Sequence, residues 1–193
     1  MNKTSRILFG LAAILLVLAY YFPLWKISLD APQYPEGLGL FIWVNSITGA
    51  KEHDLRNINA LNHYIGMKPI EPDSIKELKI MPWILGFVIF FGILGAIVNR
   101  RKMLLTWIIF LYLLGFAGIA DFYKWTYDYG HNLDYEKAAI KVPGMAYQPP
   151  IIGKKQILNF TARSYPAAGT WIIFGSVLLG MIAYGLDVHQ KKV

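Results

Sequence analysis

The sequence predicts a mainly α-helical membrane protein, a single membrane domain of residues 1–193. In it, four transmembrane helices carry a small mixed α/β outer domain built from two long loops. Three observations predict this fold. The chain is 55% hydrophobic and only 16% charged, whereas soluble domains carry about 25% charged residues. Four apolar stretches are long enough to cross about 30 Å of hydrocarbon. Basic residues gather beside the ends of these stretches.

The absence of cysteine and the location of the charges exclude several classes of protein. Without cysteine there is no disulfide-stapled scaffold, no thiolate zinc or iron–sulfur site and no catalytic cysteine. The net charge of +7 is high enough for a nucleic-acid-binding protein. However, the short hydrophilic segments 1–6, 99–102 and 187–193 hold seven basic residues and one acid, which is a topology signal. We therefore expect no nucleic-acid partner.

The apolar stretches define the expected spans. They cover about residues 7–25, 82–98, 103–120 and 169–186. The first follows two basic residues, as a signal peptide would. Its apolar run is longer than the usual signal core of about 7–15 residues, and it ends in the aromatic segment 20–25. We therefore expect a retained helix rather than a cleaved leader.

The distribution of basic residues also predicts the orientation. By the positive-inside rule, both termini are cytoplasmic and the outer loops 26–81 and 121–168 are periplasmic, in a bacterial inner membrane. The short link 99–102 predicts an antiparallel hairpin of the second and third helices. Gly92 with Ala96, and a similar pair in the fourth helix, permit close helix approach. General helix packing is favoured over a specific oligomer contact.

The first outer loop predicts a series of short elements. Short strands are expected at 27–29 and 38–44, separated by a turn at 30–37 that contains two prolines. A second turn at 45–49 precedes a helix at 54–65, with Asp54 as its N-cap.

The second outer loop begins with aromatic residues at 122–129, which predict a helical extension at the level of the lipid headgroups. A proline-rich segment at 143–150 follows, and then two strand-like pairs at 151–152 and 157–158. We expect the two loops to pack together as one small domain above the helices.

Copper is the metal that the outer loops predict. If the first-loop helix extends to Met67, then His63 and Met67 are four residues apart and share one face. An imidazole with a thioether suits copper, and the soft thioether favours Cu(I). His53, His131 and Met145 are the candidates to complete such a site. The alternative is structural: a histidine that links the loops and a methionine that packs at a helix end.

Signals of catalysis are few. The chain has no nucleophile elbow, zincin motif, P-loop or dinucleotide fingerprint. Glu36 and Asp54 are acids, but a turn residue and a helix cap explain them better than an acid–base pair does. The predicted spans contain no internal lysine, arginine or glutamate, which argues against an ion pathway. We expect neither an enzyme nor a transporter in its own right.

Three stretches carry a resemblance to a known family: 31–38, 54–67, and 149–153 with the Asn-Phe pair at 159–160. Together they resemble small bacterial membrane proteins found beside, or fused to, NosL-type copper lipoproteins of the nitrous oxide reductase maturation system. The resemblance covers both outer loops and the number of helices. The chain lacks the cysteine-based copper motif of the lipoprotein domain and so departs from that chaperone.

The resemblance implies a role in periplasmic copper delivery. It strengthens His63 and Met67 as ligands, and it places Asn59, Asn62 and Tyr64 around them. The leading hypothesis is therefore a non-enzymatic accessory protein that handles copper or docks a copper chaperone.

Two alternatives stay open. One is a metal-free structural or assembly subunit of a larger membrane complex. The other is a membrane enzyme that acts on a lipid or a quinone-like molecule near Glu36, His63 and Trp43. Membrane lipid and a protein partner are expected in each case.

Overall fold

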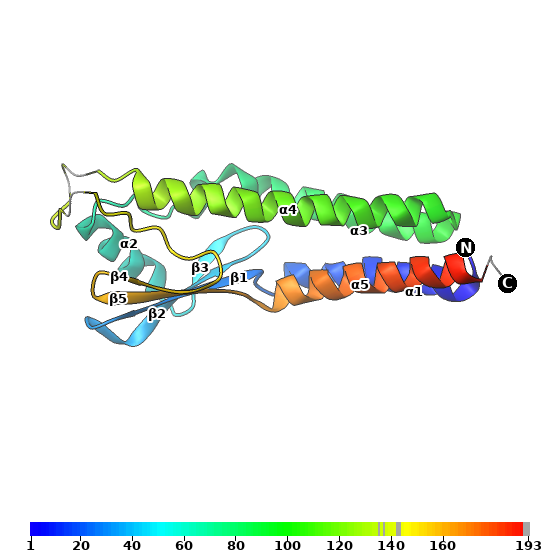
Figure 1. Cartoon of the computed structure of the whole chain (residues 1–193), viewed down its shortest axis with the longest axis horizontal. Helices are drawn as coiled ribbons and strands as arrows, with labels where there is room; N and C mark the ends of the chain where they lie inside the picture. Colours follow the sequence, from blue (N-terminus) through cyan, green and yellow to red (C-terminus); the bar gives the residue numbers. More distant parts are fainter. Residues whose placement is uncertain (135, 137, 142–143, 191–193) are drawn as a thin grey trace.

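A computed structural model describes residues 1–134, 136, 138–141 and 144–190. It confirms the coarse features of the prediction: the described chain contains four helices long and apolar enough to cross a membrane, and a small antiparallel sheet. The helices form an elongated bundle, and the sheet lies at one end of it (Figure 1). Both termini lie at the opposite end of the bundle.

The first helix is shorter than its apolar run. It consists of α1 (Lys3–Leu15) and a continuing 3₁₀ helix, η1 (Leu16–Tyr20). The side chain of Asn2 begins it by accepting a hydrogen bond from the Ser5 N–H at 2.7 Å. The predicted span reaches residue 25, but Pro23 interrupts the segment and a strand begins at Trp25.

Two of the other three helices extend well beyond their apolar stretches. α3 (Lys76–Val98) begins before the predicted position 82 and contains Pro82. α4 (Arg101–His131) has 31 residues and is about 46 Å long, which exceeds the hydrocarbon thickness of about 30 Å. The aromatic segment 122–129 is therefore helical, as predicted. α5 (Ala168–His189) completes the bundle.

Trp107 of α4 lies at the centre of the bundle, and small residues surround it. Its side chain is fully buried, and Nε1 donates to the Val88 carbonyl oxygen at 3.0 Å. A Cβ added to Gly92 would lie 2.7 Å from Ala13 Cβ, and one added to Gly180 would lie 2.9 Å from the indole ring. The small residues noted in the sequence thus pack inside the chain, around this ring.

Asp187 joins three helices at the end of the bundle that carries the termini. The residue is 2% exposed. Its carboxylate accepts from the Asn2 N–H at 2.8 Å and from Nε of Arg101. The start of α1, the start of α4 and the end of α5 are thereby tied together.

The sheet joins the two outer loops. Its order is β3-β2-β1-β5-β4, with all neighbours antiparallel. The strands are β1 (Trp25–Ala31), β2 (Tyr34–Ile42), β3 (Ile47–Gly49), β4 (Gly153–Ile157) and β5 (Phe160–Pro166). Central β1 pairs with β2 from its own loop and with β5 from the other loop. This pairing joins the two loops in one sheet.

Several strand limits differ from the prediction. The expected turn at 30–37 shrinks to Pro32 and Gln33, because β2 already begins at Tyr34. Pro35 fits within β2 because β3 pairs only with Leu40 to Ile42 and leaves the earlier part of that edge free. In the second loop the strands begin at Gly153, so the pair 151–152 lies outside them.

Helix α2 (Asp54–Tyr64) covers one face of the sheet. His53, not Asp54, occupies its N-cap position. The buried Asp54 carboxylate instead accepts from the Gly39 N–H at 2.9 Å and the Lys51 N–H at 3.1 Å, which fastens the start of the helix to β2. We call β1 to β5, α2 and their connecting segments the head domain.

Candidate binding cavity in the head domain

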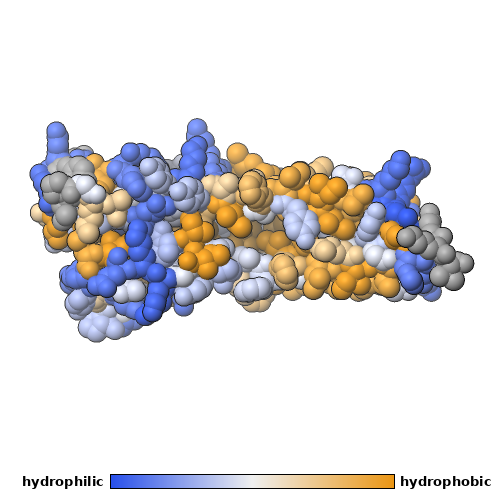
Figure 2. Space-filling model, viewed as in Figure 1, coloured by the Kyte–Doolittle hydropathy of each residue, from blue (hydrophilic) through white to orange (hydrophobic). Residues whose placement is uncertain are grey.

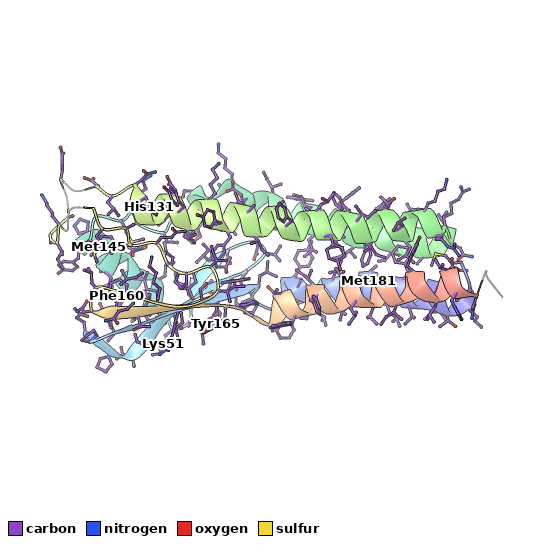
Figure 3. The ribbon with its side chains drawn as sticks, in the orientation of Figure 1. Lys51, His131, Met145, Phe160, Tyr165 and Met181 are labelled. Atoms are coloured by element: carbon purple, nitrogen blue, oxygen red, sulfur yellow. The ribbon has the colours of Figure 1, made fainter. Side chains whose placement is uncertain are left out.

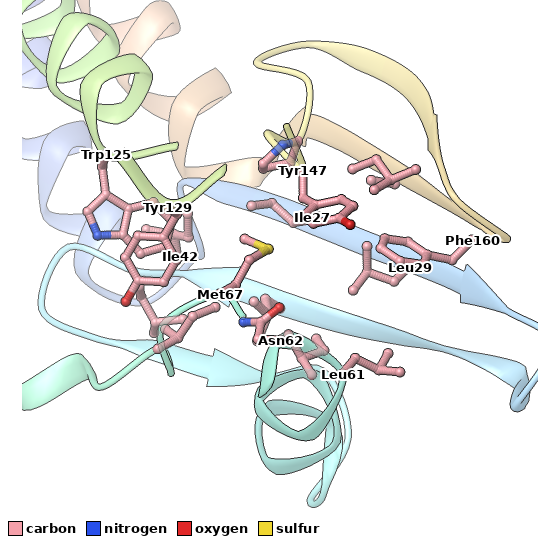
Figure 4. Close-up of a pocket in the computed structure, with 17 residues that line it drawn as sticks. Ile27, Leu29, Ile42, Leu61, Asn62, Met67, Trp125, Tyr129, Tyr147 and Phe160 are labelled. Atoms are coloured by element: carbon pink, nitrogen blue, oxygen red, sulfur yellow. The ribbon is translucent and has the colours of Figure 1, made fainter. Parts of the chain in front are cut away.

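An apolar cavity of about 60 Å³ lies within the head domain, between the sheet, α2 and the end of α4 (Figure 4). A water molecule needs roughly 10–15 Å³ of such space, so the cavity has room for about four to six non-hydrogen atoms. Its lining residues are Ile27, Leu29, Leu40, Ile42, Ile47, Ile58, Leu61, Asn62, Met67, Ile70, Trp125, Tyr129, Tyr147, Pro149, Ile157, Phe160 and Ala162.

The floor of the cavity is the inner face of the sheet. Alternate residues of a strand point to the same face, so Ile27 and Leu29 of β1 project together. The register places Leu40 opposite Ile27, and Ala162 opposite Leu29. Three strands thus supply one continuous apolar surface.

Asn62 is the polar exception in the α2 wall. It lies one helical turn after Ile58, on the buried face of the helix, and is only 8% exposed. Among the described residues, no hydrogen bond uses its side chain. Figure 4 shows the amide beside Met67, at the edge of the cavity. An amide with no protein partner at the edge of a cavity can form hydrogen bonds with a molecule bound there.

The aromatic end of α4 forms the next wall. The rings of Trp125 and Tyr129 have centroids 4.2 Å apart, and both line the cavity. The Tyr129 hydroxyl donates to the Pro69 carbonyl oxygen at 2.8 Å, which fixes the ring against the segment after α2. These residues were predicted as a headgroup belt, and the structure places two of them inside the head domain.

The segment 144–152, which we call the strap, covers the cavity from the α4 side. The Tyr147 N–H donates to the Gly130 carbonyl oxygen at 2.9 Å, and Tyr147 is 1% exposed. A Cβ added to Gly130 would lie 2.3 Å from Gln148 Cα. Only glycine therefore permits this close contact of the strap with α4.

His63 and Met67, the principal candidate ligands, are separated by the end of α2. The helix stops at Tyr64, and Gly66 has a φ of +77°, so the shared helical face required for the pair is absent. Met67 N–H closes the turn on the Asn62 carbonyl oxygen at 2.9 Å. His63 is exposed, whereas Met67 lines the cavity.

The other three candidates lie outside the cavity. His53 is exposed at the start of α2. His131 stacks on Tyr127 with ring centroids 3.9 Å apart, and Met145 is 37% exposed on the strap (Figure 3). Within the part of the chain that the structure describes, no group of three or more histidines and carboxylates is placed to hold a metal ion.

The residues proposed for catalysis or for a membrane rim are also separate from the cavity. Asp54 is held by two backbone N–H groups. Trp43 is half-buried and donates to Thr48 Oγ1 at 2.9 Å, and Glu36 is exposed. None of these three lines the cavity.

Comparison with known protein families and with curated proteins finds no match for this chain. The resemblance to proteins associated with NosL-type lipoproteins therefore stays a prediction.

Proposed function

We propose that the protein is a non-enzymatic, multi-pass membrane protein whose head domain binds an apolar or amphiphilic molecule in its cavity. The observation that carries this proposal is Asn62, a residue that is 8% exposed and whose amide has no hydrogen-bond partner among the described residues, at the edge of an otherwise apolar space. Ligand sites typically combine apolar walls with a few polar groups that orient the ligand. The size of the cavity favours a small molecule or one end of a longer one.

The proposed orientation places both termini in the cytoplasm and the head domain in the periplasm of a bacterial inner membrane. The support is the basic cluster at Arg100, Arg101 and Lys102, together with Lys3 and Arg6, all at the end of the bundle that carries the termini. Cysteine labelling from either side of the membrane tests this orientation directly.

The absence of native cysteine allows a direct test of binding. In the full chain reconstituted in vesicles, Met67→Cys places one thiol in the cavity wall, and His63→Cys places one on the nearby surface. We expect benzene, an apolar probe whose size is at the upper limit for this cavity, to slow modification of the Met67→Cys thiol by methyl methanethiosulfonate. Labelling of the His63→Cys control should be unchanged. Equal labelling of the two thiols, with no effect of benzene on either, contradicts the proposal.

Copper handling is a second candidate, and the observation that favours it is the Met67 thioether in the cavity wall. His63, His53, His131 and Met145 would have to approach it through a different arrangement of the loops. A protein partner, such as a copper chaperone or a larger membrane complex, belongs to this candidate. Titration with Cu(I) tests it: a His63→Ala, Met67→Ala double variant should bind more weakly, and unchanged binding removes the site.

A further inference from the structure

The inner side of α4 changes character between the bundle and the cavity. Leu111 is buried at 5% exposure and packs in the bundle core. Toward the head domain, the next buried residue of α4 is Thr126. These positions are separated by about 22 Å of helix. Leu114 is still half-buried against the bundle core, but residues 115–121 of α4 are all exposed.

Glycines account for this open stretch. Successive positions at three- and four-residue spacing share one face of a helix. This face runs from Leu111 through Gly115 and Gly118 to Phe122 and Trp125. A Cβ added to either glycine would meet no atom within 4 Å. We call residues 115–121 of α4 the open segment.

The open segment borders a recess on the apolar surface. Tyr112 still reaches α5, where its hydroxyl lies 3.2 Å from Met181 Sδ. Beyond that contact, Figure 2 shows the apolar surface hollowed between the α4 and α5 sides, on the half of the bundle nearer the head domain. Lipid chains are as apolar as leucine side chains, so in a membrane they can occupy such a recess.

Aromatic side chains continue this surface from the recess to the cavity. Phe122 follows the open segment, and its ring centroid lies 5.4 Å from that of Trp25 at the start of β1. Trp125, one turn later, lines the cavity. An apolar chain that follows α4 from the lipid to the cavity near Asn62 therefore lies against these rings, and it passes one carboxylate of α4, that of Asp121 at the end of the open segment.

We propose that the cavity takes the carbonyl- or hydroxyl-bearing end of a single-chain, lipid-soluble molecule that enters from the membrane along the open segment. This inference rests on the proposed function and adds the ligand class and the route. The Asn62 amide donates to a carbonyl and accepts from a hydroxyl. The cavity holds only the polar end and the first few carbons, and the rest of the chain lies along α4 in the recess.

The Asn62 contact is tested by ligand preference in the Met67→Cys reporter. A long-chain methyl ketone added to the vesicles should protect the thiol about fivefold better than the alkane of equal length, because one hydrogen bond is gained. Asn62→Leu, which keeps the side-chain shape, should abolish this preference. His63→Leu, a change on the exposed surface beside it, should not. A preference that is absent in the parent protein, or that survives in Asn62→Leu, overturns the assignment.

The route is tested by filling the recess. Gly118→Leu adds a side chain into open space, and Gly185→Leu on α5 is the matched control, since a Cβ there also meets nothing within 4 Å. In Gly118→Leu, protection by the long-chain ketone should be lost, whereas acetone, which enters from water, should still protect. Both ketones should protect in Gly185→Leu. Undiminished protection by the long-chain ketone in Gly118→Leu overturns the membrane route.

These outcomes separate the two proposals. If benzene protects the Met67→Cys thiol but no ketone is preferred, the cavity binds apolar molecules and the ligand class assigned here is wrong. If acetone protects the Met67→Cys thiol but the long-chain ketone does not, the ligand enters from water rather than from the membrane. If neither benzene nor either ketone protects the Met67→Cys thiol, the proposed function itself is contradicted.

Discussion

Around Trp107 the bundle has no space for one further carbon atom, whereas the head domain encloses a cavity of about 60 Å³. The two regions also differ in whether their polar side chains have hydrogen-bond partners. The indole Nε1 of Trp107 has its carbonyl partner, and the Asn62 amide has none among the described residues. The bundle is thus closely packed, whereas the head domain retains unfilled space beside an amide that can form hydrogen bonds, as the proposed binding of a small molecule requires.

Removal of the central ring tests the packed side of this comparison. Trp107→Ala should lower the free energy of unfolding by about 3–5 kcal/mol, because it leaves a large cavity among Phe9, Gly92 and Gly180. Thermal unfolding in detergent measures this effect. A change below about 1 kcal/mol would show that the bundle is packed no more tightly than the head domain.

Within the head domain, Asp54 is the polar group that is satisfied. Asp54→Ala should cost about 2–3 kcal/mol, because two backbone N–H groups of Gly39 and Lys51 lose a charged acceptor. Limited proteolysis should then cut near the start of α2 faster than in the parent protein. If cleavage is unchanged, α2 is held to the sheet by apolar contacts alone.

Matched additions of carbon compare the two regions directly. Gly92→Ala should destabilise the bundle by about 1–3 kcal/mol, since the new Cβ meets Ala13 and Trp107 at 2.7 Å. Ala162→Val, which adds two carbons beside the cavity, should leave stability unchanged or raise it by about 0.5–2 kcal/mol. The same thermal assay serves both variants, and equal losses would contradict the contrast.

Removal of a surface ion pair should cause the smallest loss of stability among these variants. Asp30 pairs with Arg163 on the outer face of the sheet, and both side chains are nearly half exposed. Arg163→Ala should cost less than about 1 kcal/mol, and raising the salt concentration should reduce even that. A larger loss would mean that this ion pair, rather than the inner face, stabilises the β1–β5 contact.

Prediction from the sequence succeeded where one physical rule dominates. A long apolar run without charges is typical of a membrane-spanning helix, and all four helices were predicted on this basis. Helix α2 was predicted from its spacing of apolar residues, and its end at Tyr64 was within one residue. The limits of α3 and α4 were missed because polar and aromatic residues continue those helices beyond the apolar stretch.

The cavity depends on tertiary contacts that spacing does not reveal. Pairing of β1 with β5 joins residues more than a hundred positions apart, and this pairing alone brings Ala162 beside Leu29. Asn62 left one signal in the sequence, a polar residue on the apolar stripe of α2. The helical face that His63 and Met67 were expected to share is absent, because α2 ends at Tyr64 and Gly66 turns the chain between the two residues. Their binding of copper stays a prediction.

The central place of β1 has a consequence for biosynthesis. Because a chain is made from its N-terminus, β1 and β2 can form a hairpin early, but β5 is made only after α3 and α4. Until then one edge of β1 has no partner, and the cavity lacks the wall that β5 provides. The nascent protein therefore inserts most of its helices while this edge of β1 can still pair with a wrong strand. In a chain truncated before residue 160, the same edge of β1 stays unpaired.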